Sequence, residues 1–282
     1  MSHPALNSNA VAVITGGASG IGLAAAIRFA GLGLKIAIAD IGEDRLSAAA
    51  EKISAAAPDG AAAVMTFAAD VSRREEVQRL QAAVTERFGG ADVLMNNAGV
   101  GPASSVLSSA NWERILAVNL WGVIHGTQVF APAMIGRARP GLIINTGSKQ
   151  GITTPPGNPA YNLSKAGVKV FTEALQHELR NTPGCRVSAH LLIPGFVFTG
   201  LTAAGRTEKP AGAWTAEETV DFMLARLAAG DFYILCPDNE TPRSLDERRI
   251  LWAAGDLVEN RPALSRWRPD YAAAFADFIA KR

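Results

Sequence analysis

The feature that most constrains this chain of 282 residues is the alternation of short apolar runs with longer amphipathic stretches. The runs are continuously apolar, as expected of parallel strands covered on both faces. They lie at 11–15, 35–40, 63–70, 92–99, 142–148 and 186–195, with a candidate seventh at 232–237. Strand and helix repeated in this way predict an α/β fold, a Rossmann-type doubly wound sheet of about seven parallel strands.

The stretches between these runs predict the helices. They span roughly 20–31, 43–57, 72–88, 109–136 and 159–180. Two helix starts carry a capping box, in which a Ser or Thr and a Glu three residues later satisfy each other's backbone N–H groups: Ser72 with Glu75, and Thr215 with Glu218. No linker or repeat interrupts the pattern. We therefore expect a single domain over residues 1–237 and a C-terminal extension over 238–282.

Composition argues against several classes of protein. The formal net charge is +1 and the basic residues are scattered, so no nucleic-acid partner is expected. Cys185 and Cys236 lie far apart and are interpreted as reduced thiols, with a surface disulfide as the alternative. The four histidines are dispersed, so no metal site is expected. The N-terminus lacks a signal-peptide pattern, and no apolar run approaches the ~20 residues of a membrane span. These features indicate a soluble, cytoplasmic protein.

The first predicted strand runs into a helix through a glycine-rich turn, "VAVITGGASGIGLAAAIRF". Gly16, Gly20 and Gly22 follow the spacing G-x-x-x-G-x-G. Glycines are needed where the backbone must approach a pyrophosphate, and the helix that follows offers free N–H groups and its positive end to that anion. A tight turn with close packing is the alternative explanation of these glycines taken alone.

The second predicted strand ends at Asp40, which indicates the kind of nucleotide. A carboxylate here would accept hydrogen bonds from both hydroxyls of an adenosine ribose and would repel a 2′-phosphate. No Arg or Lys lies in the glycine turn or directly after Asp40, where Ile41 follows, and we interpret Arg45 as a solvated helix residue. The pattern favours NAD over NADP. A carboxylate that caps the next turn is the alternative.

Six motifs occur together in a characteristic order. They are "TGGASGIG" (15–22), "NNAG" (96–99), Asn119 within "VNLWG", Ser148, "YNLSK" (161–165) and "PGFVFT" (194–199). Ser148 precedes Tyr161 by thirteen residues. In this order and spacing the chain resembles the short-chain dehydrogenases/reductases, over roughly residues 9–200. The resemblance implies that residues 1–237 form a Rossmann-fold catalytic domain.

The resemblance also implies roles for four residues. Tyr161 is the expected general acid/base, and Lys165 is expected to hold the nicotinamide ribose and lower the pKa of the phenol. Ser148 is expected to orient the substrate oxygen. Asn119 is expected to keep a helix kinked around a water that passes protons from Lys165 towards solvent.

The resemblance places the cofactor along the carboxyl end of the sheet. Asp70 and Val71 are expected beside the adenine, and Thr199 at the nicotinamide carboxamide. The residues expected to bind NAD are Gly16, Ser19, Gly20, Ile21, Gly22, Asp40, Ile41, Asp70, Val71, Asn97, Ala98, Gly99, Tyr161, Lys165, Pro194, Gly195, Val197 and Thr199.

The chemistry of "YNLSK" can also be argued from the residues. Tyr161 and Lys165 are four positions apart and so share one helix face. Moving a phenol pKa from about 10 to about 7 needs roughly 4 kcal/mol of preferential stabilisation of the phenolate. A neighbouring ammonium and an oxidised nicotinamide have the right charge for this. An exposed, non-functional helix pair is the alternative for the two residues alone.

The substrate pocket is less well indicated. The segment 196–214 is the expected mobile cover, and Val100, Phe196 and Trp214 are apolar candidates for substrate contact that could equally be core residues. Lys149 and Gln150 follow Ser148 and are expected either to face the substrate or to be solvated.

The C-terminal extension is expected to form a helix at roughly 243–259, an extended arm and a short terminal helix, packed on its own or a neighbouring subunit. Its layout resembles bacterial aromatic-alcohol dehydrogenases, which favours a bulky or aromatic substrate.

These patterns predict an NAD(H)-dependent oxidoreductase that interconverts a secondary alcohol and a ketone. Two alternatives stay open: a reductase of an enoyl or imine bond on the same fold, and a non-catalytic nucleotide-binding regulatory protein. The resemblance further implies a homodimer or homotetramer that pairs through the helices predicted at 109–136 and 159–180.

Overall fold

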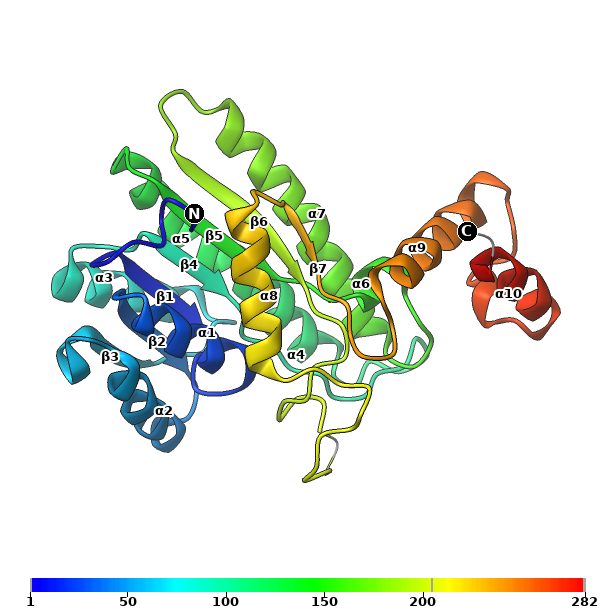
Figure 1. Cartoon of the computed structure of the whole chain (residues 1–282), viewed down its shortest axis with the longest axis horizontal. Helices are drawn as coiled ribbons and strands as arrows, with labels where there is room; N and C mark the ends of the chain where they lie inside the picture. The colour runs from blue at the N-terminus through cyan, green and yellow to red at the C-terminus, as the bar shows by residue number, and fades with distance from the viewer. Residues whose placement is uncertain (1, 204, 281–282) are drawn as a thin grey trace.

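The structure, a computed structural model, describes residues 2–203 and 205–280. Seven parallel strands form one sheet in the order β3-β2-β1-β4-β5-β6-β7, seen edge to edge across Figure 1. This confirms the predicted Rossmann-type sheet. The strands are β1 (Val11–Thr15), β2 (Lys35–Asp40), β3 (Val64–Ala68), β4 (Val93–Asn96), β5 (Gly141–Thr146), β6 (Val187–Ile193) and β7 (Tyr233–Leu235).

Helices cover both faces of the sheet. Buried side chains of α1, α2 and α8 form a core on one face, and those of α3, α5 and α7 form a core on the other. The α-helices are α1 (Gly20–Gly31), α2 (Glu43–Ala56), α3 (Arg74–Phe88), α4 (Trp112–Leu116), α5 (Gly122–Gly136), α6 (Gln150–Thr153), α7 (Pro159–Asn181), α8 (Ala216–Ala228), α9 (Arg243–Val258) and α10 (Ala272–Ala280). Within the described residues, none of these helices has the length and apolar character needed to cross a membrane.

The strands are apolar throughout because alternate side chains enter opposite cores. In β1, Ala12 and Ile14 join the core under α1, whereas Val11 and Val13 join the core under α3 and α5. The edge strand β3 is different, since only Val64 among its residues is buried. Its side chains are covered less because no further strand extends the sheet beyond it.

One local prediction is refined and another is corrected. The helix expected at 109–136 begins at Trp112 and continues to Gly136, but its segment Ala117–Trp121 is a π-helical turn between α4 and α5. The capping box of Ser72 and Glu75 is wrong, because α3 begins only at Arg74. The Asp70 carboxylate accepts the Ser72 N–H instead, which forms a tight turn before the helix. The capping box of Thr215 and Glu218 at α8 is confirmed in both directions.

The C-terminal extension projects from the body, with α9 and α10 at the far right of Figure 1. The helix expected at 243–259 is present as α9, but the expected extended arm contains two short 3₁₀ turns, Ser265–Trp267 and Pro269–Tyr271. Trp252 is the centre of a small core of its own, with edge-on contacts to Phe275 and Phe278.

A chain of buried polar side chains crosses the middle of the sheet. Asn96 on β4 donates to Asn145 on β5 at 2.8 Å, and Asn145 donates to Thr172 on α7 at 3.0 Å. Thr172 in turn donates to the Val168 carbonyl at 2.6 Å. All three side chains are almost inaccessible to solvent, so each needs the others as hydrogen-bond partners.

We therefore expect Asn145→Leu to lower the free energy of unfolding by about 1–3 kcal/mol, because it removes the Asn145 acceptor of a buried Asn96 side-chain N–H and the Asn145 donor to the buried Thr172 hydroxyl. Urea denaturation followed by circular dichroism measures this. The matched control is Asn181→Leu at the exposed end of α7, expected to change stability by no more than about 0.5 kcal/mol. Equal stabilities of the two variants would contradict the prediction.

Candidate active site

The start of α7 positions Tyr161 and Lys165. Asn158 accepts a hydrogen bond from the Tyr161 N–H as the helix cap, and Pro159 occupies the first turn, where its missing N–H costs nothing. Tyr161 is half-buried and Lys165 is buried. The Lys165 ammonium lies 5.7 Å from the centre of the Tyr161 ring, so the two side chains share one helix face as predicted.

The Lys165 ammonium is anchored to the end of β5. Its Nζ donates a hydrogen bond of 2.8 Å to the Thr146 carbonyl. The neighbouring Ser164 hydroxyl donates to the Tyr161 carbonyl at 2.7 Å, which supports the same turn of α7. These contacts join the helix that carries Tyr161 to the carboxyl end of the central sheet.

Asn119 lies within the π-helical turn and is fully buried. Its Oδ1 accepts from the Val100 N–H at 2.8 Å, and its Nδ2 donates to the Val100 carbonyl at 2.9 Å and to the Ser164 hydroxyl at 3.3 Å. The side chain thus clamps the segment after β4 against α7. A π-turn of this kind often marks a functional site, because the extra residue redirects a side chain inward.

Ser148 lies just after β5 and faces Tyr161. Its hydroxyl lies near enough to the Tyr161 phenol to lower the pKa of that group, and it accepts a hydrogen bond from the Gln150 N–H at 3.2 Å. The serine, tyrosine and lysine that the sequence placed far apart therefore meet at one point beyond the carboxyl ends of β5 and β4.

Burial changes the acidity of both titratable side chains at this point. It raises the pKa of Tyr161, and the nearby Ser148 hydroxyl opposes that rise without overcoming it. Burial also lowers the pKa of Lys165 to about 8. The expectation that Lys165 and an oxidised nicotinamide together lower the pKa of the phenol stays a prediction.

The glycine-rich turn lies beside this point, at the end of β1. A Cβ on Gly22 would lie 2.3 Å from the Gly16 carbonyl and 2.6 Å from Asn97 Nδ2, so only glycine allows α1 to begin this close to the turn. Asn97 Nδ2 donates to the Thr15 carbonyl at 3.2 Å and to the Gly16 carbonyl at 3.3 Å. The glycine turn and the "NNAG" segment after β4 therefore form one rigid wall.

Asp40 closes the other end of this wall. Its carboxylate accepts from the Ile41 N–H at 2.8 Å and the Ala18 N–H at 3.3 Å. Arg45 donates to the same carboxylate at 3.1 Å, although the guanidinium side chain is 57% exposed. The expectation that Arg45 is only a solvated residue is thus incomplete, because it pairs with the residue expected to select the nucleotide.

One cavity of about 630 Å³ joins these parts. It is long enough to be lined by Asp40 at one end and by Tyr161 at the other, which fits a dinucleotide and its substrate. Of the residues predicted from the sequence, those that line it are Gly16, Ser19, Gly20, Ile21, Asp40, Ile41, Asp70, Val71, Asn97, Ala98, Gly99, Val100, Ser148, Tyr161, Lys165, Pro194, Gly195, Val197 and Thr199. Gly22 and Asn119 lie behind its wall and support it.

Three substrate candidates lie elsewhere. Gln150, Phe196 and Trp214 are not among the described residues that line this cavity. Trp214 packs against Phe222 of α8, with ring centres 5.6 Å apart, because the backbone at Val197 pairs with Trp214 and turns its side chain to the core. Gln150 is exposed at the start of α6. These positions give no support to substrate contact.

The structure adds lining residues that the motifs did not indicate. They are Arg45, Arg114, Val118, Thr146, Gly200 and Thr202, among others. Leu201, in the segment 196–214 expected to cover the cleft, also lines the cavity, and both Leu201 and Tyr161 lie close to Gly101. Ala204 of this segment lies outside the described residues. Across the described chain, no group of three or more His, Cys, Asp or Glu side chains could hold a metal ion.

The buried ammonium of Lys165 leads to a stability prediction. Its pKa is lowered from 10.5 to about 8, so the folded state disfavours the charged form by about 3 kcal/mol at pH 7. Lys165→Met removes that charge and one hydrogen bond to Thr146, and we expect it to raise the free energy of unfolding by about 2 kcal/mol at pH 7.

The pH dependence follows from the sign of the shift. The penalty is complete below about pH 8 and disappears as the pH rises towards 10.5, where the unfolded lysine also loses its proton. The stability difference between Lys165→Met and the parent, measured by urea denaturation, should shrink over that window. Lys169→Met, on the same helix and paired with Glu173, is the control. A Lys165→Met protein less stable than the parent at pH 7 would refute the prediction.

Comparisons with known proteins agree with this architecture. Residues 10–210 match the family described as short chain dehydrogenase. The 1-deoxy-11-beta-hydroxypentalenate dehydrogenase of Streptomyces exfoliatus is 32% identical over 263 residues, which cover 91% of this chain and 93% of the relative.

Solved structures of similar fold include a short chain dehydrogenase/reductase from Burkholderia phymatum in complex with NAD. It is 34% identical with a TM-score of 0.81, and the match covers 93% of this chain and 98% of that one. The apo form of LigD from Sphingobium sp. strain SYK-6 is 23% identical with a TM-score of 0.75, over 89% of this chain and 97% of that one, which shows the shared fold alone. Together with the match over residues 10–210, these similarities show that the chain belongs to the short-chain dehydrogenase/reductase family of oxidoreductases.

Proposed function

We propose that this protein is an NAD(H)-dependent alcohol dehydrogenase/carbonyl reductase that interconverts a secondary alcohol and a ketone. The observation that carries the proposal is that Ser148, Tyr161 and Lys165 share one cavity with the glycine turn and Asp40. A proton-handling group thus lies at one end of a site suited to a dinucleotide. The dehydrogenases and reductases among its relatives support the reaction class.

The residues of the cavity fit such a cofactor. When bound, a nicotinamide cofactor supplies the hydride acceptor or donor and, when oxidised, a positive charge. The turn through Gly16, Ser19 and Gly20, which line the cavity, would hold the pyrophosphate, and Lys165 the nicotinamide ribose. The residues proposed to hold the adenosine end are Asp40, Ile41, Asp70 and Val71, and those for the nicotinamide end are Pro194, Gly195, Val197 and Thr199, with Asn97, Ala98 and Gly99 between them.

Tyr161 is proposed as the general acid/base. It would take the hydroxyl proton of an alcohol, or return it to a carbonyl oxygen, within reach of the Ser148 hydroxyl. Because burial raises the pKa of the phenol, stabilisation of the phenolate must come from positive charge. The Lys165 ammonium is the side chain placed to provide it, and the Ser148 hydroxyl would hydrogen-bond the developing alkoxide. Asn119 and Lys165 would pass the proton towards solvent through a water.

NAD is proposed as the preferred cofactor because the Asp40 carboxylate stands where a 2′-phosphate would otherwise be accommodated. A relative crystallised in complex with NAD supports this. Arg45 would favour NADP instead, since its guanidinium can bind a 2′-phosphate whenever it is not paired with Asp40.

The substrate is proposed to be a bulky or aromatic alcohol or ketone. Val100 and Leu201 give the part of the cavity near Tyr161 an apolar surface.

We further propose a cytoplasmic homo-oligomer, a dimer or a tetramer. The π-turn before α5 and the outer face of α7 carry exposed apolar side chains, with Trp121 52%, Leu163 52% and Val170 63% exposed. A second copy that covered them would remove this apolar surface from water. The extension over 238–282 would then pack beside this assembly or on its own subunit.

Replacement of the phenol tests the mechanism. We expect Tyr161→Phe to lower kcat/KM by about 10²–10⁴-fold, because the general acid/base is lost. NADH fluorescence titration should show that the variant still binds the cofactor. Tyr233→Phe, at the exposed end of β7, is the matched control and should keep full activity.

Wild-type turnover by Tyr161→Phe would disprove the mechanism. Turnover of only enoyl or imine substrates by the parent protein would favour the alternative of a reductase of those bonds. A parent that binds NADH but turns over no substrate in a broad panel would favour the regulatory alternative.

Replacement of Asp40 tests the choice of cofactor. We expect Asp40→Ser to raise the ratio of kcat/KM for NADPH over that for NADH by about tenfold or more. This is the effect expected of one charge-assisted hydrogen bond between the 2′-phosphate and Arg45, which the substitution frees from its ion pair. Adding Arg45→Gln should reverse most of that gain. Better catalysis with NADPH than NADH by the unaltered protein would show that Asp40 does not select NAD.

A further inference from the structure

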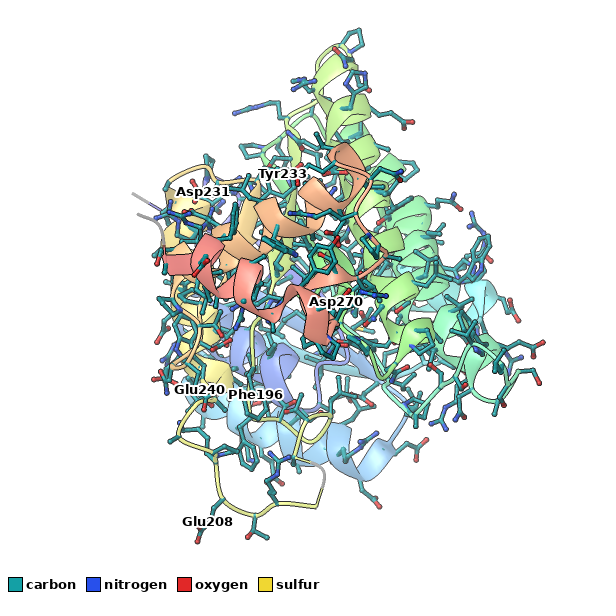
Figure 2. The ribbon with its side chains drawn as sticks, turned by 90° about the vertical axis from the view of Figure 1, so that its right-hand side faces the viewer. Phe196, Glu208, Asp231, Tyr233, Glu240 and Asp270 are labelled. Carbon is teal, nitrogen blue, oxygen red and sulfur yellow. The ribbon has the colours of Figure 1, made fainter. Side chains whose placement is uncertain are left out.

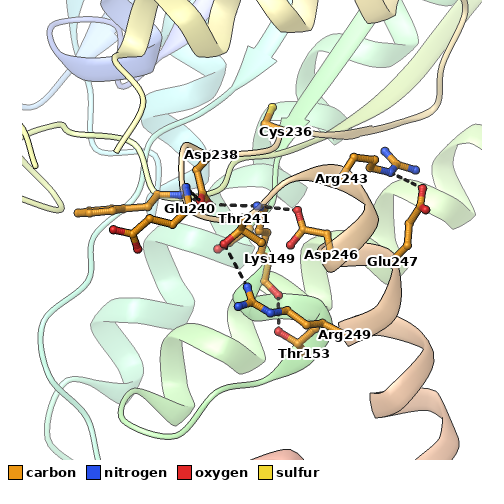
Figure 3. Close-up of polar contacts among 12 residues, drawn as sticks. Lys149, Thr153, Cys236, Asp238, Glu240, Thr241, Arg243, Asp246, Glu247 and Arg249 are labelled. Carbon is orange, nitrogen blue, oxygen red and sulfur yellow. Dashed lines mark hydrogen bonds and ion pairs between the residues drawn. The ribbon is translucent and has the colours of Figure 1, made fainter. Parts of the chain in front are cut away.

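Lys149, the residue after Ser148, does not face the substrate cavity. Its ammonium lies 3.1 Å from Asp238 Oδ2 and 2.6 Å from Asp246 Oδ2. The three side chains are only 16%, 8% and 5% exposed. Figure 3 shows the ammonium between the two carboxylates. Lys149 therefore forms ion pairs. It neither faces the substrate nor lies in solvent, the two alternatives expected from the sequence.

Both carboxylates belong to the C-terminal extension over 238–282, but to different elements of it. Asp238 lies in the loop after β7, whereas Asp246 lies in the first turn of α9. Figure 2 looks onto the side of the body from which that extension projects. Arg249, one turn after Asp246, donates to the Thr241 hydroxyl at 3.2 Å and brings a second positive charge. The cluster of Lys149, Asp238, Asp246 and Arg249 is thus balanced in charge.

Asp238 joins this cluster to the proposed nicotinamide segment. The same oxygen that contacts Lys149 accepts the Phe196 N–H at 3.2 Å. Burial acts to raise the pKa of Asp238, but its contacts with Lys149, Phe196 and Thr241 outweigh burial and hold the pKa below its ordinary value. An ionised Asp238 therefore fixes the backbone between Gly195 and Val197, both of which line the cavity.

Gly195 shows how closely the cluster approaches this backbone. A Cβ at Gly195 would lie 2.5 Å from Asp238 Oδ2 and 2.9 Å from Lys149 Nζ. The ion pair consequently rests against the Cα of a residue on the cavity wall. The Lys149 N–H also donates to the Pro194 carbonyl at 3.3 Å, so Lys149 holds the segment from a second side.

We propose that Asp246 is a positioning residue through which the C-terminal extension, by way of Lys149 and Asp238, fixes the Pro194–Thr199 segment for the nicotinamide half of the cofactor. This inference rests on the proposed NAD(H) binding. The adenosine half is proposed to lie at Asp40 and the glycine turn, which are not part of the Pro194–Thr199 segment, so we expect its binding not to depend on the cluster. A contact that merely stabilised the fold would affect both halves alike.

Asp246→Asn tests the proposal, because it keeps the shape of the side chain and removes the charge. The probes are NADH, which has both halves, and ADP-ribose, which lacks the nicotinamide. We expect Kd for NADH to rise about tenfold, the effect of losing one charged contact, with Kd for ADP-ribose unchanged within about twofold. The matched control is Glu247→Gln, the next carboxylate on α9, which is exposed and paired with Arg243 (Figure 3). It should leave both constants unchanged.

Asp246→Glu provides a milder variant, which keeps the charge and moves it by one methylene. It should restore most of the NADH affinity. Wild-type NADH affinity in Asp246→Asn would overturn the proposal, as would equal losses of NADH and ADP-ribose affinity. If the parent protein itself bound neither probe, the proposed function would fail instead, so the two failures are distinguishable.

Discussion

The hydrogen bond from Lys165 to the Thr146 carbonyl joins the helix of the proposed general acid/base to the end of the central sheet. The other parts of the site are arranged around it. Ser148 lies two residues after Thr146, and Tyr161 lies one turn before Lys165. A parallel sheet brings the carboxyl ends of all its strands to one edge. The glycine turn after β1 and Asp40 at the end of β2 therefore line the same cavity as Ser148, Tyr161 and Lys165.

The two lysines of this region, sixteen residues apart in the sequence, differ in how their charges are compensated. Lys149 lies between two carboxylates, and its charge is neutralised locally. Lys165 contacts a carbonyl, and burial lowers its pKa to about 8. Its ammonium is costly to the fold but remains available to stabilise a nearby phenolate. The stability lost at Lys165 is thus linked to the chemistry proposed for Tyr161.

Most of the site was predictable because its motifs are local in sequence. The glycine spacing, Asp40 at a strand end and the Tyr161–Lys165 pair each depend on one turn or one strand. The distortion of the helix at Asn119 was expected only from the resemblance to the family, because the π-turn depends on the contact of that side chain with Val100. Trp214 shows the same limit. An apolar residue can line a pocket or fill a core, and only its pairing with Val197 placed it against Phe222.

The sequence by itself determined the order of strands and helices, the seven-stranded Rossmann-type sheet and the family, because these depend on periodicity and on closely spaced motifs. Only the tertiary structure decided the contacts between distant segments. It pairs Arg45 with Asp40 and places Lys149 between Asp238 and Asp246. It also buries Tyr161, which raises the pKa of the phenol. The physical reason is that desolvation and ion pairing depend on what surrounds a side chain in space, which neighbouring residues in the chain do not reveal.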